Sequence, residues 1–150
     1  MSGACTSGGP PSQALPDVCG LPSRSPQFLV EGERFGGWRL IVLEGRNGVP
    51  FELVFDAPQL GSSGCGTPAP EAVLGRFAGG GRWQGEDLVY VYGSVLPPVE
   101  TVTVSYQNGL TVELRPVAAD GMQHRFYAHV SGGTGAVNVS AFDGAGRLIA

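Results

Sequence analysis

The feature that most constrains this sequence is a pair of alternating segments in its C-terminal half. Residues 101–106 (TVTVSY) and 110–114 (LTVEL) place an apolar side chain at every second position, which is the period of a β-strand with one buried face. Asn108-Gly109 lies between them, and this pair readily adopts the positive φ angles of a type I′ turn. The pattern predicts a hairpin whose valine, tyrosine and leucine side chains face a core.

Shorter segments of the same kind occur along the chain and are separated by Gly, Pro, Asn and Asp. Residues 38–44 (WRLIVLE) are apolar on both faces, so we expect a strand in the interior of a sheet. Strands at this spacing, with no long helical pattern, predict an all-β fold: an antiparallel, immunoglobulin-like β-sandwich of about eight to nine strands. The expected strands are residues 28–30, 38–44, 51–56, 88–92, 101–106, 110–114, 124–130, 137–142 and 147–149, with turns at 45–48, 131–135 and 143–146.

Three segments give weaker signals. Residues 61–66 are expected to form a loop. Residues 70–77 fit either one or two helical turns, because Pro70 suits a first helical position, or a short strand over 73–77. The run Gly79-Gly80-Gly81 predicts a flexible connection that reaches residue 86.

The first residues differ in composition from the rest. Residues 1–26 are rich in Ser, Gly and Pro, which predicts a flexible tether before a β-sandwich domain at 27–150. Cys5 follows a small residue and precedes a polar stretch, as in the lipid-attachment junction of a bacterial lipoprotein. The apolar region of a signal peptide is missing before Cys5, so either the sequence starts at the mature end or the likeness is chance.

The three cysteines are Cys5, Cys19 and Cys65, an odd number. Cys19 and Cys65 lie among Gly and Pro residues on either side of the first strand pair. We expect a disulfide between them, which an oxidising compartment would permit. The alternative is two unpaired thiols in a cytosolic protein.

Charge gives no general reason to expect a nucleic acid or an anionic membrane as partner, because the formal net charge is −4 and the pI is about 5.0. All nine cationic side chains are arginine, which is typical of GC-rich codon usage. The sequence has no apolar run long enough for a transmembrane helix.

A resemblance rests on several short motifs of the last 60 or so residues. They are Tyr92-Gly-Ser-Val, Val99-Glu-Thr-Val-Thr-Val, Asn108-Gly109, Phe126-Tyr127 and the closing Ala141-Phe-Asp-Gly-Ala-Gly-Arg-Leu-Ile. Together they resemble a β-sandwich module of uncharacterised cell-envelope proteins and lipoproteins of high-GC Gram-positive bacteria. The resemblance implies an immunoglobulin-like extracytoplasmic domain and carries over no catalytic residue.

Motifs for catalysis or metal binding are weak. His124 and His129 are five residues apart, so a regular strand directs them to opposite faces, one expected toward solvent and one packed at an edge. Glu52, Asp56, Glu100 and Glu113 fall on strand faces expected to be wet. The glycines at 79–81 lack the Lys and Ser/Thr of a phosphate-binding loop. We therefore predict no catalytic residue, no metal and no cofactor.

The best binding hypothesis involves Arg82, Trp83 and Gln84, where a loop tryptophan could stack on a sugar or anchor a partner protein. The alternative is that Trp83 folds back to close one end of the sandwich. The sequence favours a non-catalytic, extracytoplasmic structural or protein-interaction domain of the bacterial cell envelope, with an envelope protein or glycan as partner. The second hypothesis is a carbohydrate-binding module that uses Trp83, and the third is a thiol-dependent enzyme that uses Cys65.

Overall fold

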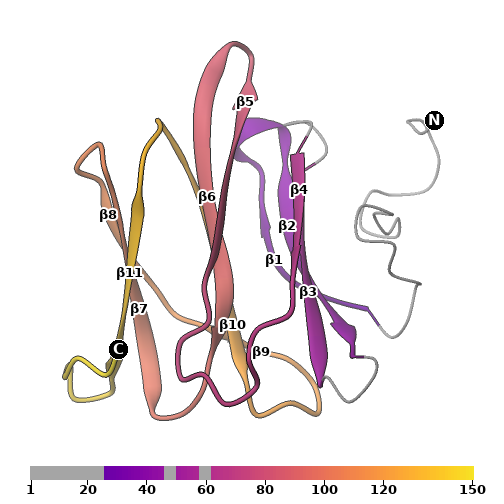
Figure 1. Cartoon of the computed structure of the whole chain (residues 1–150), viewed down its shortest axis with the longest axis vertical. Helices are drawn as coiled ribbons and strands as arrows, with labels where there is room; N and C mark the ends of the chain where they lie inside the picture. The colour runs from indigo at the N-terminus through magenta and orange to yellow at the C-terminus, as the bar shows by residue number, and fades with distance from the viewer. Residues whose placement is uncertain (1–25, 46–49, 58–61) are drawn as a thin grey trace.

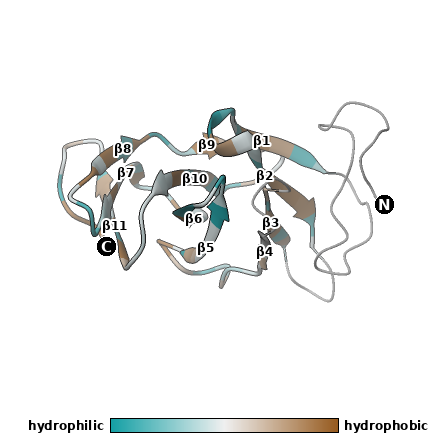
Figure 2. Cartoon of the chain, turned by 90° about the horizontal axis from the view of Figure 1, so that it is seen from above, coloured by the Kyte–Doolittle hydropathy of each residue, from teal (hydrophilic) through white to brown (hydrophobic). Residues whose placement is uncertain are grey.

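The computed structural model describes residues 26–45, 50–57 and 62–150, which form three antiparallel sheets stacked in layers (Figures 1 and 2). Sheet A contains, in spatial order, β1 (Gln27–Gly32), β2 (Trp38–Glu44), β3 (Phe51–Ala57) and β4 (Ser62–Gly66). Sheet B contains β5 (Phe77–Trp83), β6 (Glu86–Val95), β10 (Arg125–Gly132) and β9 (Val117–Ala118). Sheet C contains β11 (Val137–Asp143), β7 (Val99–Tyr106) and β8 (Thr111–Leu114).

Sheet B is the middle layer, because its two central strands are apolar on both faces. In β6, Leu88, Tyr90 and Tyr92 pack into the core shared with sheet A. The alternate residues Val89 and Val91 pack into a second core shared with sheet C. A strand that is buried on both faces needs a layer on each side, so the alternation of β6 explains the stack seen in Figure 2.

Stacked aromatic rings form the centre of the core between sheets A and B. The ring of Phe55 on β3 lies 4.4 Å from that of Tyr90 at 11°, 5.5 Å from that of Tyr92 and 5.6 Å from that of Trp38. Burial, reinforced by the nearby Tyr90, raises the pKa of Tyr92 to about 12, so its hydroxyl stays protonated at neutral pH. Phe77 on β5 extends the stack to the edge of sheet B, 5.4 Å from Tyr92.

The same rings explain the glycines of β4. A Cβ at Gly64 would lie 2.8 Å from the hydroxyl oxygen of Tyr92, and one at Gly66 would lie 2.6 Å from Cζ of Phe77. Only a residue without a side chain lets this strand approach the stack so closely. Residues 61–66 were expected to form a loop, and this expectation was wrong because the glycines serve packing in a strand that pairs with β3.

Most strands lie where the alternation predicts them. The segments expected at 28–30, 38–44, 51–56, 88–92, 101–106, 110–114, 124–130 and 137–142 correspond to β1, β2, β3, β6, β7, β8, β10 and β11. β2 lies inside sheet A between β1 and β3, as its apolar character predicted. The described residues form eleven strands, more than the eight to nine expected. The expected turn at 45–48 falls mostly outside the described residues.

The flexible connection expected after Gly79 is instead a strand and a tight turn. β5 continues to Trp83, which pairs with Glu86 across a two-residue turn. Gln84 and Gly85 have φ angles of 52° and 82°, as a type I′ turn requires. Three consecutive glycines suggested flexibility, but the pairing with β6 holds them in an extended strand.

The hairpin of β7 and β8 is confirmed, but its turn type differs from the prediction. Only Gly109 has a positive φ angle, 96°, and its N–H donates to the carbonyl of Tyr106 at 3.0 Å. The side chain of Asn108 accepts a hydrogen bond from the N–H of Leu110 at 2.9 Å. This geometry is that of a three-residue loop whose last residue is left-handed, rather than a type I′ turn.

Two further segments form less regular structure than expected. Residues 70–77 contain neither a helix nor a strand before Phe77, and Leu74 makes only a single bridge to Val95. Residues 147–149 were expected to form a last strand, but Leu148 makes only a single bridge to Phe142.

Replacing Phe55, the ring at the centre of the stack, tests its contribution. We expect Phe55→Ala to lower the free energy of unfolding by about 3–5 kcal/mol, because a fully buried ring is lost and a cavity remains. Phe55→Leu keeps part of the volume and should cost less. Denaturant unfolding of the three proteins measures the difference, and equal stabilities of the wild type and Phe55→Ala would contradict the role assigned to the stack.

Candidate functional site

An open groove of about 620 Å³ follows β5 on the side of sheet B that faces sheet C. Its floor includes Ala78, Gly80 and Arg82, whose positions on β5 are exposed. Its opposite wall is residues 134–137, which lead into β11. We call this hollow the β5 groove.

The backbone at this groove has an edge that pairs with no strand among the described residues. β5 is the terminal strand of sheet B and pairs with β6 on one side only. In a two-residue hairpin the closing pair, here Trp83–Glu86, exchanges hydrogen bonds between its two backbones. Along an antiparallel ladder, hydrogen-bonded pairs alternate with pairs whose N–H and C=O groups point outward. It follows that Ala78, Gly80 and Arg82 direct their backbone N–H and C=O groups away from β6.

Charge in the β5 groove is more positive than negative, in contrast to the chain as a whole. Arg82 lines it, with Nε 3.3 Å from a carboxylate oxygen of Asp87 and Nη2 donating to the carbonyl of Gly85 at 2.8 Å. Arg76 lines the groove as well and donates from Nη1 to the carbonyl of Val137 at 3.1 Å. Two guanidinium groups thus accompany one carboxylate in the lining.

The three residues of the binding hypothesis lie together at the end of the β5–β6 hairpin but do not share a surface. Arg82 lines the groove, and Gln84 is an exposed turn residue. Trp83 points to the other side of β5, where it is half-buried against the core between sheets A and B. Its ring meets that of Phe35 edge to face at 6.2 Å. This is the packing expected if Trp83 folds back on the sandwich.

The two histidines lie on opposite sides of sheet B, as their spacing predicts. His124 is buried beside the ring of Phe51, 4.8 Å away, and its Nε2–H donates to the carbonyl of Pro70 at 2.9 Å. His129 is half-buried on the side of sheet C, with Nδ1 2.7 Å from the hydroxyl of Tyr106. The expectation that one histidine faces solvent was wrong, because each ring has a packed partner.

The Tyr106–His129 pair is neutral in the folded protein. Burial raises the pKa of the Tyr106 hydroxyl. Burial, and after it the positive charge of Arg34, lowers the pKa of His129. The hydrogen bond between these two neutral groups links sheet C to sheet B.

This pair predicts a dependence of stability on pH. Because the pKa of His129 is lowered in the folded state, the unfolded chain takes up a proton at this residue first as the pH falls. The stability that the neutral histidine contributes is therefore fully present above about pH 6.5 and decreases as the pH is lowered toward the folded-state pKa. The slope contributed by this histidine is at most about 1.4 kcal/mol per pH unit. We expect His129→Gln to remove this component in denaturant unfolding from pH 8 to 5. The control His124→Gln keeps the Tyr106–His129 pair and should keep the slope.

Cys65 lies on β4, directly opposite Val54 of β3, and its sulfur is disulfide-bonded. Cys19 and Cys5 lie outside the described residues, so the pairing of Cys65 with Cys19 stays a prediction.

The carboxylates fall into two groups. Glu100 and Glu113 are exposed, as predicted. Glu52 and Asp56 were expected on a wet face, and this was wrong, because both are buried on β3. Asp56 accepts a hydrogen bond from Nε of the buried Arg39 at 2.8 Å, which satisfies its charge away from water.

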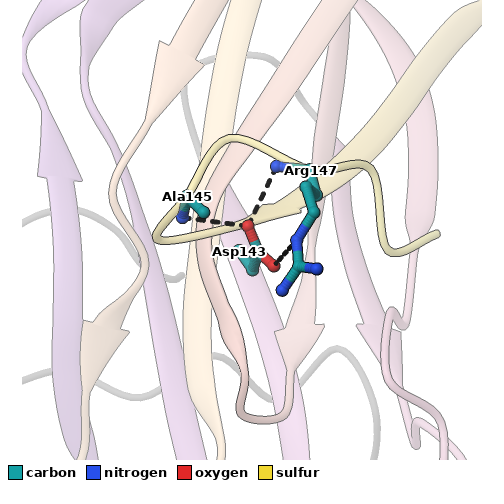
Figure 3. Close-up of polar contacts among 3 residues, drawn as sticks. All are labelled: Asp143, Ala145 and Arg147. Carbon is teal, nitrogen blue, oxygen red and sulfur yellow. Dashed lines mark hydrogen bonds and ion pairs between the residues drawn. The ribbon is translucent and has the colours of Figure 1, made fainter.

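Asp143 organises the turn that ends β11 (Figure 3). One carboxylate oxygen accepts from the backbone N–H groups of Ala145 and Arg147, both at 2.9 Å. The other accepts from Nε of Arg147 at 3.0 Å. These bonds, the one from the Arg147 N–H first, hold the pKa of Asp143 below its usual value. The Asp-Gly-Ala-Gly-Arg motif is therefore a turn, as predicted, and the carboxylate of Asp143 and Nε of Arg147 are bonded to each other within it.

No family model, curated protein or solved structure matches this chain. In the described part of the chain, no cluster of three or more His, Cys, Asp or Glu side chains has the geometry for a metal ion. No helix among the same residues is long and apolar enough to cross a membrane.

Sequence analysis missed the β5 groove, apart from Arg82. Arg76, Asp87 and residues 134–137 belong to separate segments that only the fold brings together. One signal was available: Phe77, Gly79, Gly81 and Trp83 alternate with exposed positions, which is strand periodicity carried by glycines. The run of three glycines concealed it.

Proposed function

We propose that this chain is a non-catalytic protein-interaction domain of the bacterial cell envelope, and that it binds an extended segment of a partner protein along β5. The observation that carries the proposal is the unpaired outer edge of β5 beside the β5 groove. Outward N–H and C=O groups at the edge of a sheet can pair with an added strand.

The side chains of the edge favour this mode of binding. Ala78 and Gly80 leave the groove floor almost flat, so an incoming backbone can approach without a steric barrier. Arg76 and Arg82 favour a partner segment with an acidic residue, because charge complementarity adds specificity to backbone pairing.

Blocking one backbone donor tests this function. In Gly80→Pro the outward N–H is replaced by a ring, whereas Gly80→Ala adds a side-chain carbon and keeps the N–H. We expect the proline variant to bind an extended acidic peptide, selected on the wild-type protein from a random peptide library, about tenfold or more weakly. The alanine variant should bind within a few-fold of wild type.

Calorimetric titration of the selected peptide gives both affinities, and thermal unfolding shows whether the two variants are equally folded. Equal affinities of the proline and alanine variants would rule out strand addition at β5. A library that yields no peptide would count against the proposal in the same way.

The fold type within the all-β class is part of this proposal. Sheets B and C have the four-plus-three division of a constant-type immunoglobulin sandwich. Their strand order departs from it, because β10 pairs with β6 in sheet B rather than joining the three-stranded sheet. We therefore propose an immunoglobulin-like relation for the number and packing of these strands only.

The extracytoplasmic location rests on the cysteines. A disulfide at Cys65 is typical of an oxidising compartment. We propose Cys19 as its partner and Cys5 as the site of a lipid anchor, with residues 1–26 as the tether.

Intact mass of the protein purified from its native host tests the location. We expect a lipid-sized addition on Cys5 and a mass increase on reduction that corresponds to one disulfide. Three free thiols without added mass would place the protein in a reducing compartment and contradict the envelope assignment.

The two alternatives have weaker support. A carbohydrate-binding role predicts that glycan-array binding disappears in Trp83→Ala. Its support is weaker because the ring of Trp83 packs against that of Phe35. A thiol-dependent enzyme needs a free thiolate at Cys65, whereas this sulfur is disulfide-bonded.

A further inference from the structure

The pairing with β6 extends past the first residue of β5. The N–H of Gly75 donates to the carbonyl of Ser94 at 2.7 Å, and the N–H of Ser94 donates to the carbonyl of Gly75 at 3.3 Å. This bonded pair keeps the register of Phe77–Tyr92, the first pair of β5 with β6. Because bonded pairs alternate with outward-pointing positions along an antiparallel ladder, the backbone N–H and C=O of Arg76 point away from β6. The edge proposed for strand addition therefore starts at Arg76.

Two arginines lie at the ends of this edge, on its groove side. Arg76 and Arg82 both line the β5 groove and are six positions apart, which is about 20 Å along a strand. An even separation places both side chains on the same face of the sheet. Ala78 and Gly80 lie between them on that face, so the strand presents only one methyl group to the groove between the two charges. An added strand thus meets two positive charges at a fixed spacing.

The two guanidinium groups differ in the contacts that they already make. Nε of Arg82 lies 3.3 Å from a carboxylate oxygen of Asp87, which partly neutralises its charge. Arg76 forms no ion pair with a carboxylate among the described residues. Its Nη1–H donates to the carbonyl of Val137 on the opposite wall of the groove, at 3.1 Å. A guanidinium has five N–H donors, so this one bond positions Arg76 and leaves it able to bind a carboxylate.

We propose that Arg76 selects the partner of β5 by binding an acidic side chain at one fixed position of the added strand. The inference rests on the proposed function, because only a strand that pairs with β5 has a defined register. Residues directly opposite each other in an antiparallel ladder lie on the same face, with Cβ atoms about 4.5–5.5 Å apart. The acidic side chain therefore belongs to the residue directly opposite Arg76.

The direction of the added strand gives the position of this acidic residue in the partner sequence. Every described strand pair of sheet B is antiparallel, and an added antiparallel strand continues that pattern. In that direction the acidic residue comes four positions after the residue opposite Gly80. An acidic residue opposite Arg82 would come six positions before it, and it adds less because Asp87 already contacts Arg82.

Replacing charges on both sides of the contact is the first test. The peptide is the extended acidic one selected on the wild-type protein, and each of its acidic residues is changed in turn to the corresponding amide. We expect one change to weaken binding about tenfold and the others to have effects within about threefold. Calorimetric titration gives the affinities.

Arg76→Gln and its matched control Arg82→Gln identify the partner of that acidic residue. In Arg76→Gln, which keeps an amide donor for the carbonyl of Val137, the tenfold effect of the critical acid-to-amide change should disappear. In Arg82→Gln the effect should persist. Thermal unfolding shows whether the two variants are equally folded. A tenfold effect that persists in Arg76→Gln, or a peptide in which no single acidic residue dominates, would overturn the proposal.

A disulfide cross-link is the second test, and it measures the register. Gly80→Cys is mixed with a peptide whose cysteine stands four positions before the critical acidic residue, directly opposite position 80. The Cα atoms of such a pair lie about 5.5 Å apart, within the range of a disulfide. We expect this peptide to link to residue 80, as shown by peptide mapping, and a peptide with its cysteine shifted by one position to link poorly. Equal linking of both peptides would contradict the register. If Arg76→Gln does not fold, the amide series on the wild-type protein and this cross-link decide.

The proposal and the proposed function fail in distinguishable ways. If Gly80→Pro weakens binding but Arg76→Gln leaves the critical acidic residue as important as before, strand addition stands and the role of Arg76 is refuted. If Gly80→Pro and Gly80→Ala bind equally, strand addition itself is refuted, and the role of Arg76 with it. A library that yields no peptide has the same consequence.

Discussion

The structure depends on the burial of both faces of β6. Consecutive apolar residues from Leu88 to Tyr92 cannot leave either face in water, so sheet B must lie between two other layers. Sheets A and C are each needed to cover one side of it. The order of the layers follows from this one strand.

The two interfaces of sheet B differ in chemistry. Toward sheet A, the stacked rings around Phe55 need close approach, and the glycines of β4 provide it. Toward sheet C, small β-branched residues dominate, and the Tyr106–His129 hydrogen bond adds a polar link. One interface is therefore sensitive to the shape of its rings, and the other responds to pH through a single imidazole.

The three-layer arrangement also leaves two surfaces with different consequences. β5 lies at the end of sheet B with its outer edge unpaired among the described residues, which supports strand addition by a partner. On the outer face of sheet A, Ile41, Leu43 and Val54 are buried, and Cys65 is the ladder partner of Val54.

The sequence by itself determined the all-β class and eight of the strands among β1 to β11. It also determined that His124 and His129 lie on opposite faces. Both follow from the alternation of side chains along a strand, which is a local property. It did not reveal β4, whose glycines make room for aromatic rings from other strands. It did not reveal β5 either, because its glycines are held in a strand by pairing with β6. Nor did it reveal that Glu52 and Asp56 are buried, since alternation says which residues share a face and not what covers that face. The tertiary structure alone decided the stacking of three sheets and the β5 groove, because Arg76, Asp87 and residues 134–137 meet only through long-range pairing.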